Sequence, residues 1–361
     1  MAVKPYKLAL VGLSAVGLAA VAACGEAPSD SGDDNADASF LACMVTDSGG
    51  VDDKSFNESS WNGMLAAEEE NDDIKVDFKE SSSETDYDPN LQSSVDDGCN
   101  FIVGVGGLMT ENVNAIATAN PDVSFATVDG FSEVENVYSI QFDTAQSAFL
   151  AGYVAAAQTQ TGTVATWGGL QIPPVTIFMD GFARGIAKHN EDKGTDVQLL
   201  GWDVEAQEGT FINGFESATD GKSQSDTFIE QGADIIFPVA GPAGIGALTA
   251  AAEDDAVTAI WVDTDGYEST DYGSEIITSA EKGLANAVKD SVLAAYDAAQ
   301  GGDAVTGSYI GTLENGGVSL APFHDFEDDV SDETKAEIDA LTQQIIDGTL
   351  VVESPASPTA G

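Results

Sequence analysis

Short apolar runs alternate along the chain with longer segments in which apolar positions recur every three or four residues. The first run is FLACMVT, and the next are IKVDF, NFIVGVG and VSFATVD, each separated from the following one by a helix-like segment such as KSFNESSWNGMLAAEEE. This alternation is typical of βαβ units, in which helices cover both faces of a parallel sheet. The pattern therefore predicts an α/β fold.

The same rhythm begins again after Thr144, with TGTVATW, VQLLGW, ADIIFPVA and VTAIWVD as its apolar runs. This predicts a second, similar Rossmann-like lobe. The later pieces include a long helix from about Glu281 to Gln300 and are too few for a third domain, so we expect the chain to return and complete both lobes. The predicted N-terminal lobe comprises 40–143 plus about 266–312, and the C-terminal lobe 144–265 plus about 313–352. Residues 353–361 are predicted to be a loose tail.

Residues 1–24, MAVKPYKLALVGLSAVGLAAVAAC, combine Lys4 and Lys7 with a short apolar run of small residues. These features are typical of an export signal. Val21-Ala22-Ala23-Cys24 also resembles the lipobox of prokaryotic lipoproteins, whose cysteine carries the lipid. An uncleaved membrane anchor is the alternative, and either one places the rest of the chain outside the cytoplasm, held at the cell membrane. The stretch 25–39 has no apolar periodicity and predicts a disordered tether.

With Cys24 reserved for lipid, Cys43 and Cys99 remain in a compartment that permits disulfides. Each lies beside an apolar run, and the two runs are expected to be neighbouring strands. The sequence therefore predicts a Cys43–Cys99 disulfide, with two buried free thiols as the alternative.

The charge is strongly negative, because 62 acidic residues face 12 basic residues and give a formal net charge of -50. Phosphate backbones are bound through Lys and Arg, so this composition argues against a nucleic-acid partner. A solvated, soluble surface is the expected role of the acidic excess, and adaptation to salty surroundings fits equally.

The stretch VTDSGGVDDKSFNESSW (45–61) joins the first apolar run to the first helix-like segment. Ser55 and Glu58 fit a capping box, so the helix is predicted to begin at Phe56. Asp47 then ends the strand, while Phe56 and Asn57 occupy the first helical turn, beside the carboxyl ends of the strands where such folds bind ligands. A core or hydrophobic-staple position is the alternative for Phe56.

The acidic residues of this stretch do not fit a common metal or phosphate motif. The Lys and Ser/Thr of a phosphate-binding loop are missing, and the spacing is not that of an EF-hand. A partial resemblance to the calcium-binding motif of nucleoside hydrolases leaves an alternative in which Asp47, Asp52 and Asp53 act with calcium. His189 and His324 are expected to be solvated rather than zinc ligands. We therefore predict no metal and no cofactor.

Several blocks together resemble the basic membrane protein family, the lipoprotein receptors of ABC importers that include a purine nucleoside receptor. In order they are MVTDSGGVDDKSFNESSWNGM, FATVDG, GFARG, GTFINGFESATDGK, ADIIFPVAGPAGIGAL, WVDTDG, IITSAEK, GTLENGGVSLAPF and IIDGTLVV, spanning about 40 to 352. The resemblance implies a type I periplasmic-binding fold with a hinged cleft that holds a nucleoside, its base sandwiched between one aromatic ring of each lobe. By motif position these rings are Phe56 and Phe211.

The resemblance also implies polar contacts. Asp47, Asn57 and Asp129 match polar positions of the family, and Asp129 matches a carboxylate that meets the base edge. Gly241 and Gly244 suit close approach of the backbone to a ligand, or simply a strand-to-helix turn.

Asp263 and Lys282 match the ribose contacts of the family, with Asp265 as an alternative to Asp263. Thr278 to Glu281 fit a second capping box, which would place Lys282 in the first turns of a helix, where a cation is disfavoured and therefore suggests a ligand role. Two departures from the family pattern, Gly266-Tyr267 and Asn213, affect the ribose contacts and the preference among nucleosides.

The sequence thus predicts a monomeric surface lipoprotein that binds a nucleoside, expected to be a purine nucleoside, and delivers it to the permease of an ABC importer without catalysis. A calcium-dependent nucleoside hydrolase and a ligand-sensing subunit of a signalling system are the alternatives.

Overall fold

The computed structural model describes residues 40–358. The predicted export signal, the lipidation at Cys24 and the tether 25–39 lie outside these residues, as do the last three residues of the predicted tail. No helix within 40–358 is long and apolar enough to cross a membrane.

The first sheet has six parallel strands in the order β13-β5-β4-β3-β1-β2. Its residues alternate between two apolar clusters, one on each face, as the period of a strand requires. Helices α1 and α9 cover one face, and α2 and α3 cover the other. The elements are β1 (Phe40–Val45), α1 (Phe56–Glu70), β2 (Ile74–Lys79), α2 (Tyr87–Asp96), β3 (Phe101–Val105), α3 (Thr110–Ala119), β4 (Ser124–Val128), β5 (Val137–Phe142), α9 (Leu284–Ala299) and β13 (Ser308–Gly311).

The second sheet has the order β14-β12-β11-β10-β6-β7, parallel except for β14. Helices α4, α5 and α10 pack on one face, and α6 and α7 on the other. The elements are α4 (Ala145–Gln158), β6 (Thr163–Gly168), α5 (Pro173–Lys193), β7 (Gln198–Leu200), α6 (Ala218–Glu230), β10 (Ile235–Val239), α7 (Ile245–Ala252), β11 (Thr258–Asp263), β12 (Ile276–Lys282), β14 (Val318–Leu320) and α10 (Asp332–Ile346), with the short β8 (Trp202–Asp203), β9 (Glu208–Gly209) and α8 (Gly266–Ser269) outside the sheet.

Both sheets follow one scheme, in which the first strand of the lobe lies between the second and the third. This order creates a switch point between the first and third strands, and ligands of such sheets bind beyond the carboxyl ends there. The predicted α/β architecture with two Rossmann-like lobes is confirmed. This topology predicts a ligand site at the residues that follow β1 and β3 in one lobe and β6 and β10 in the other.

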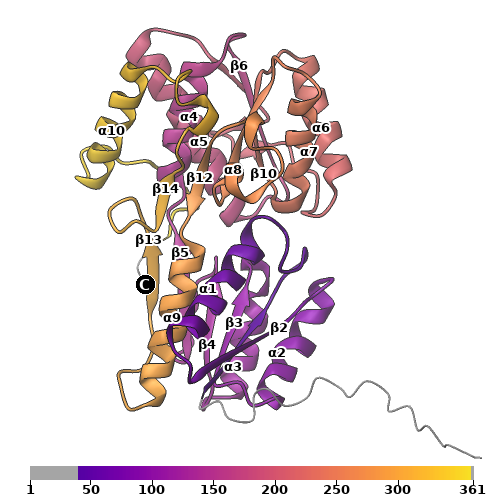
Figure 1. Cartoon of the computed structure of the whole chain (residues 1–361), viewed down its shortest axis with the longest axis vertical. Coiled ribbons are helices and arrows are strands. Elements are labelled where there is room, and N and C mark those ends of the chain that lie inside the picture. Colours follow the sequence, from indigo (N-terminus) through magenta and orange to yellow (C-terminus); the bar gives the residue numbers. More distant parts are fainter. Residues whose placement is uncertain (1–39, 359–361) are drawn as a thin grey trace, which may run out of the picture. The chain divides into compact units, whose positions relative to one another are not determined.

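The boundary between the lobes differs from the expected one around β12. The sequence predicts that about 266–312 belong to the N-terminal lobe, yet Ile276–Lys282 pairs with β11 in the second sheet. The return begins one element later, with α9 packed against α1 and β13 added beside β5 (Figure 1). The capping box expected at Thr278 is wrong, because Thr278 to Glu281 are strand residues and the helix begins at Leu284.

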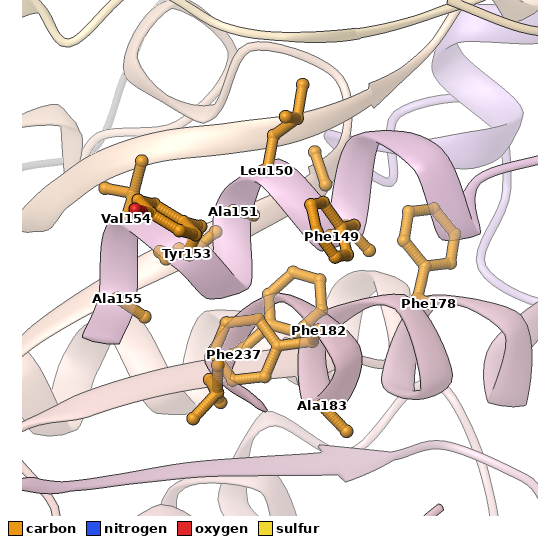
Figure 2. Close-up of a cluster of buried hydrophobic side chains, with 14 of the residues drawn as sticks. Phe149, Leu150, Ala151, Tyr153, Val154, Ala155, Phe178, Phe182, Ala183 and Phe237 are labelled. Atoms are coloured by element: carbon orange, nitrogen blue, oxygen red, sulfur yellow. The ribbon is translucent and has the colours of Figure 1, made fainter. Parts of the chain in front are cut away.

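Close packing between α4 and α5 explains the GFARG block. A Cβ atom at Gly185 would lie 2.0 Å from the carbonyl oxygen of Phe149, and one at Gly152 would lie 2.1 Å from that of Phe182. The glycines therefore let the two helices approach closely, and the rings of α5 fill the space toward the sheet. Figure 2 shows Phe182 beside Phe237 of β10, stacked at 4.6 Å between ring centroids.

The predicted disulfide is present, and the two histidines are less exposed than the sequence suggested. Cys43 and Cys99 form a disulfide, with their Cα atoms 5.9 Å apart. His189, expected to be solvated, is only 6% exposed on α5 and packs edge-on against Tyr153. His324 is partly buried and stacks on Tyr267.

The segment 353–358 is held against the body, although the sequence suggested a loose tail. Ser354 Oγ donates a 2.6 Å hydrogen bond to Asp180 on α5. Ser357 Oγ donates one of 2.9 Å to Asp143, at the point where the chain first passes from the first sheet to α4. We call this segment the C-terminal strap.

Replacement of Ser354 by Ala should destabilise the protein. Asp180 is fully buried and also accepts hydrogen bonds from Trp202 and Gln207, both through Oδ1, so the variant would leave Oδ2 without its donor. We expect the free energy of unfolding to fall by about 1–3 kcal/mol, the cost of an unsatisfied buried acceptor. Urea unfolding monitored by circular dichroism measures this change.

Ser274→Ala is the matched control, because Ser274 is exposed and its hydroxyl bonds only to the carboxylate of the next residue, Glu275. It should change stability by less than about 0.5 kcal/mol. Equal unfolding midpoints for the two variants would contradict the structural role of the strap.

Candidate functional site

A cavity lies at the carboxyl ends of both sheets, at their switch points. Seven of the nine predicted ligand residues line it: Asp47, Phe56, Asn57, Asp129, Gly241, Asp263 and Lys282. Its free volume is about 80 Å³, well below the ~300–1,000 Å³ typical of ligand pockets. The cavity must therefore widen before a drug-sized solute enters it.

Lys282 is the centre of this cavity. It ends β12 and is 5% exposed, and no other Lys or Arg within 40–358 is buried. Its Nζ atom donates to Asp129 Oδ2 at 2.7 Å and lies 3.4 Å from Asp263 Oδ1. Burial lowers the pKa of Lys282, but the two carboxylates outweigh burial and raise that pKa above its usual value. The lysine is therefore charged, and it joins a residue that follows β4 of the first sheet to the last residue of β11 in the second.

Aromatic rings surround the same ammonium group. Nζ lies 4.9 Å from the ring centroid of Phe56 on α1 and 5.3 Å from that of Phe178 on α5. Both distances are within the range of cation–π attraction. The lysine head thus lies against Phe56, the ring expected to stack on a ligand base.

Asp129 and Asp263 share an unusual backbone conformation. Their φ angles are 61° and 68°, in the left-handed region that residues other than glycine seldom adopt. Asp tolerates this region better than most residues, at a cost of order 1 kcal/mol or more. The same left-handed backbone conformation, at the end of a central strand in each sheet, turns both carboxylates toward Lys282.

The helix α1 begins at Phe56, as predicted, but its cap is not the expected capping box. Ser55 Oγ makes no cap and donates instead to Asp263 Oδ2 at 2.8 Å, a bond from the first lobe to the second. The carboxylate of Asp53 accepts hydrogen bonds from the backbone N–H groups of Ser55, Asn57 and Glu58. Asp53 therefore caps the helix, which frees Ser55 for the contact between lobes.

Asp47, which is partly buried, and Asn57, which is buried, form a polar pair beside α1. Asn57 Nδ2 donates to Asp47 Oδ1 at 2.9 Å, whereas Asn57 Oδ1 is buried without a hydrogen-bond partner. Gly106, which follows β3, has a φ of 119°, and a Cβ atom there would lie 2.4 Å from Asp47 Oδ2. Only glycine allows this close approach of the two strand ends, and Asn57 Oδ1 is left as an acceptor for a ligand donor.

Burial dominates the electrostatics of the two carboxylates near α1. It raises the pKa of Asp47 to about 7 and that of Asp53 to about 6, against the hydrogen bonds that each accepts. Near neutral pH the cavity therefore holds a partly protonated set of carboxylates around one lysine.

Two predicted residues lie away from the cavity lining. Phe211 packs edge-on against Trp202 and lies over Gly168, where a Cβ atom would meet its ring at 2.7 Å. Phe215, four residues later, lines the cavity, as does Phe178. Gly244 is not part of the lining; it packs against Trp261, consistent with the turn that was the alternative reading. The GTFINGFESATDGK block contains both phenylalanines, and motif position selects Phe211, whereas Phe215 is the one that lines the cavity.

Asp265 also points elsewhere. Its Oδ2 atom lies 2.6 Å from His324 Nε2, and its Oδ1 accepts from the backbone of Tyr267. It is absent from the cavity lining, whereas Asp263 is present. Of the two carboxylates in WVDTDG, Asp263 is the one available to a solute.

The carboxylates of the Asp52-Asp53 stretch do not converge on a cation position. Asp52 is exposed, and Asp53 already accepts three backbone hydrogen bonds. Within residues 40–358, no group of three or more His, Cys, Asp or Glu side chains is arranged to hold a metal ion.

The chain is similar to proteins of known families along almost its whole length. A family model described as "ABC transporter substrate-binding protein PnrA-like" (Bmp) matches residues 40–355. A CD4+ T-cell-stimulating antigen of Listeria innocua is 30% identical over 97% of this chain and 98% of its own length. The ABC transporter nucleoside-binding protein BmpA of Lactococcus lactis is 30% identical over 96% and 99%.

Solved structures agree on the fold. An ABC transporter solute-binding protein of Aeropyrum pernix superposes with a TM-score of 0.77 over 87% of this chain and 94% of its own, at 23% identity. The two lobes therefore form the type I periplasmic-binding fold expected from the sequence.

Asp47→Asn should change the dependence of stability on pH. Asp47 has a pKa of about 7 in the folded protein and an ordinary value of 3.8, so the folded state holds a proton that the unfolded state releases between about pH 4 and pH 7. This contribution stabilises the fold at low pH, is lost as pH rises through that window, and stays lost above it. We expect the variant to match the wild type near pH 4 and to be more stable above pH 7.

Urea unfolding at several pH values between 4 and 8 tests this difference, and exposed Asp52→Asn serves as the control. The control should follow the wild type at every pH. If Asp47→Asn also runs parallel to the wild type, Asp47 is not a buried proton-holding group.

Proposed function

The chain belongs to the Bmp family of PnrA-like ABC transporter substrate-binding proteins, and we propose that its solute is a nucleoside with a purine base, held between the two lobes. Substrate-binding proteins of ABC transporters bind a solute for a transporter and are not enzymes. The calcium-dependent hydrolase alternative is therefore set aside. A relative of similar length, BmpA of Lactococcus lactis, is named for nucleoside binding and supports this choice of solute.

The observation that carries the proposal is the chemistry of the cavity around Lys282. Four carboxylates, those of Asp47, Asp53, Asp129 and Asp263, line the cavity with a single lysine. Such a lining repels phosphate groups and favours an uncharged solute rich in donors. Aromatic rings in the same cavity suit a flat base. A nucleoside is an uncharged solute with a flat ring and hydroxyl groups, whereas a nucleotide carries phosphate and a plain sugar has no flat ring.

In the proposed complex the base stacks on Phe56 from the first lobe. The partner ring of the second lobe is Phe215, because it lines the cavity and Phe211 does not. Asp129 accepts an N–H group of the base edge, and Asn57 Oδ1, buried without a partner, accepts another donor of the ligand. Gly241 brings the backbone close to the solute.

The ribose fits the opposite polarity of Asp263 and Lys282. A carboxylate accepts from a sugar hydroxyl, while an ammonium donates to a neighbouring one. Asp263 Oδ1 has no hydrogen bond and lies 3.4 Å from the lysine, so this oxygen is available to a hydroxyl.

Solute binding requires the lobes to separate, since the free volume is small and Lys282 lies against Phe56. Three crossings join the lobes, after β5, after β12 and between β13 and β14. They are the hinge in the proposal. The lipid on Cys24 would hold the protein at the outer face of the membrane beside the permease that receives the solute.

A thermal-shift panel tests the class of solute. Purine nucleosides should raise the melting temperature in a concentration-dependent manner, because a ligand that binds only the folded state stabilises it by mass action. Nucleotides, free sugars and free bases should give smaller shifts, since each lacks one of the matched features or carries phosphate. Stabilisation by sugars but by no nucleoside would refute the proposal.

Ring truncations test the geometry of the complex. Phe56→Ala and Phe215→Ala should each weaken nucleoside binding in calorimetry by about 1–3 kcal/mol, the usual value of base stacking on an aromatic ring. Phe211→Ala is the matched comparison: it should lower thermal stability, because its ring packs on Trp202 and Gly168, and leave the affinity nearly unchanged. Loss of affinity in Phe211→Ala alone would return the sandwich to Phe211.

A further inference from the structure

A second cavity of about 410 Å³ adjoins the candidate site. The two cavities share one wall, which includes Asp129, Leu108 and Pro174. The rest of the second cavity is largely apolar, and the C-terminal strap closes part of it. Its own lining includes Phe131, Phe142, Ile177, Ala356 and Pro358.

One polar group in this apolar cavity lacks a partner. Gln141, on β5, lines the second cavity and not the first. Its Nε2 atom is buried and makes no hydrogen bond. An unsatisfied buried donor is costly, and an acceptor supplied by a ligand would remove that cost. Phe131, which also lines this cavity, is 42% exposed, and a ligand group in the cavity would cover part of its ring.

Asp129 connects the two cavities chemically. Its Oδ2 atom accepts from Lys282, which leaves Oδ1 for a donor of the ligand. An adenine that carries one substituent on its 6-amino nitrogen keeps a single N–H on that nitrogen. When this N–H points to Asp129, the substituent on the same nitrogen also lies close to Asp129, a residue that lines both cavities.

We propose, on the basis of the function proposed above, that the second cavity is a side compartment for the apolar 6-substituent of a modified purine nucleoside. The ligand class is the N6-alkylated adenosines. The alkyl chain contacts Phe131, Phe142 and Ile177, and a hydroxyl group at its end accepts a hydrogen bond from Gln141 Nε2. The C-terminal strap forms the far wall through Ala356 and Pro358.

Isothermal titration of the full chain with four nucleosides tests this assignment. N6-isopentenyladenosine should bind about tenfold more tightly than adenosine, because the substituent leaves water for an apolar compartment. Its terminally hydroxylated form, trans-zeatin riboside, should bind at least as tightly, since its hydroxyl meets Gln141. N6,N6-dimethyladenosine, which has no N–H at this nitrogen, should bind less tightly than adenosine.

Two test variants and one control locate the substituent without changing a residue of the first cavity. Ala356→Phe fills the second cavity and should remove the advantage of N6-isopentenyladenosine while leaving adenosine affinity unchanged. Ala299→Phe, which adds the same ring at an exposed position at the end of α9, is the control and should change neither. Gln141→Leu should remove any preference for the hydroxylated form over the isopentenyl form.

The outcomes separate the two proposals. Tight adenosine binding with much weaker N6-isopentenyladenosine binding would overturn the side compartment and leave the proposed function intact. An isopentenyl advantage that persists in Ala356→Phe would also overturn it, because the substituent would then lie elsewhere. Failure of all four nucleosides to bind would overturn the proposed function and this inference with it.

Discussion

The buried ion pair between Lys282 and Asp129, with Asp263 close by, is the interaction on which the rest of the site depends. A lysine that is 5% exposed is stable only with carboxylates beside it, since removing one partner of such a pair costs about 3–5 kcal/mol. Because Asp129 follows a strand of one sheet and Lys282 ends a strand of the other, the requirement for charge balance also holds the lobes together. The left-handed conformations of Asp129 and Asp263 are strain that this balance sustains.

Much of the fold follows from the apolar pattern, because strands that are buried on both faces appear in the sequence as short continuous runs of apolar residues. Pattern reasoning fails where a short motif competes with that signal. Thr278 to Glu281 satisfy a capping box, yet Ile276 to Ala280 are buried without a break and belong to a strand. The burial of five consecutive residues favours a strand more strongly than a four-residue capping motif favours a helix start. The lobe boundary depends on which sheet this strand joins, and its pairing with β11 is a tertiary contact that the apolar pattern does not specify.

The site was predictable to the extent that its residues stand at strand ends. Asp47, Asp129, Asp263 and Lys282 each end or follow a strand, so the topology alone brings them together. The topology does not place loop residues in the same way. Phe211 and Phe215 lie in one loop, and only contacts with distant residues decide which ring faces the cavity. Likewise, Ser354 reads as a tail residue until Asp180, 174 positions earlier, is seen to accept its hydrogen bond.

The acidity of the chain acquires a specific meaning at the cavity. Of 12 basic residues, Lys282 alone is buried within the described part of the chain, and it stands among four carboxylates. Its ammonium group contacts the same ring and carboxylates that a nucleoside is proposed to use. Binding is then an exchange, in which base and ribose groups replace contacts of the lysine rather than add to them. The free-energy cost of removing these carboxylates from water is already included in the stability of the folded protein. A solute therefore gains affinity chiefly from ring stacking and from hydrogen bonds to oxygens that lack a donor, such as Asn57 Oδ1.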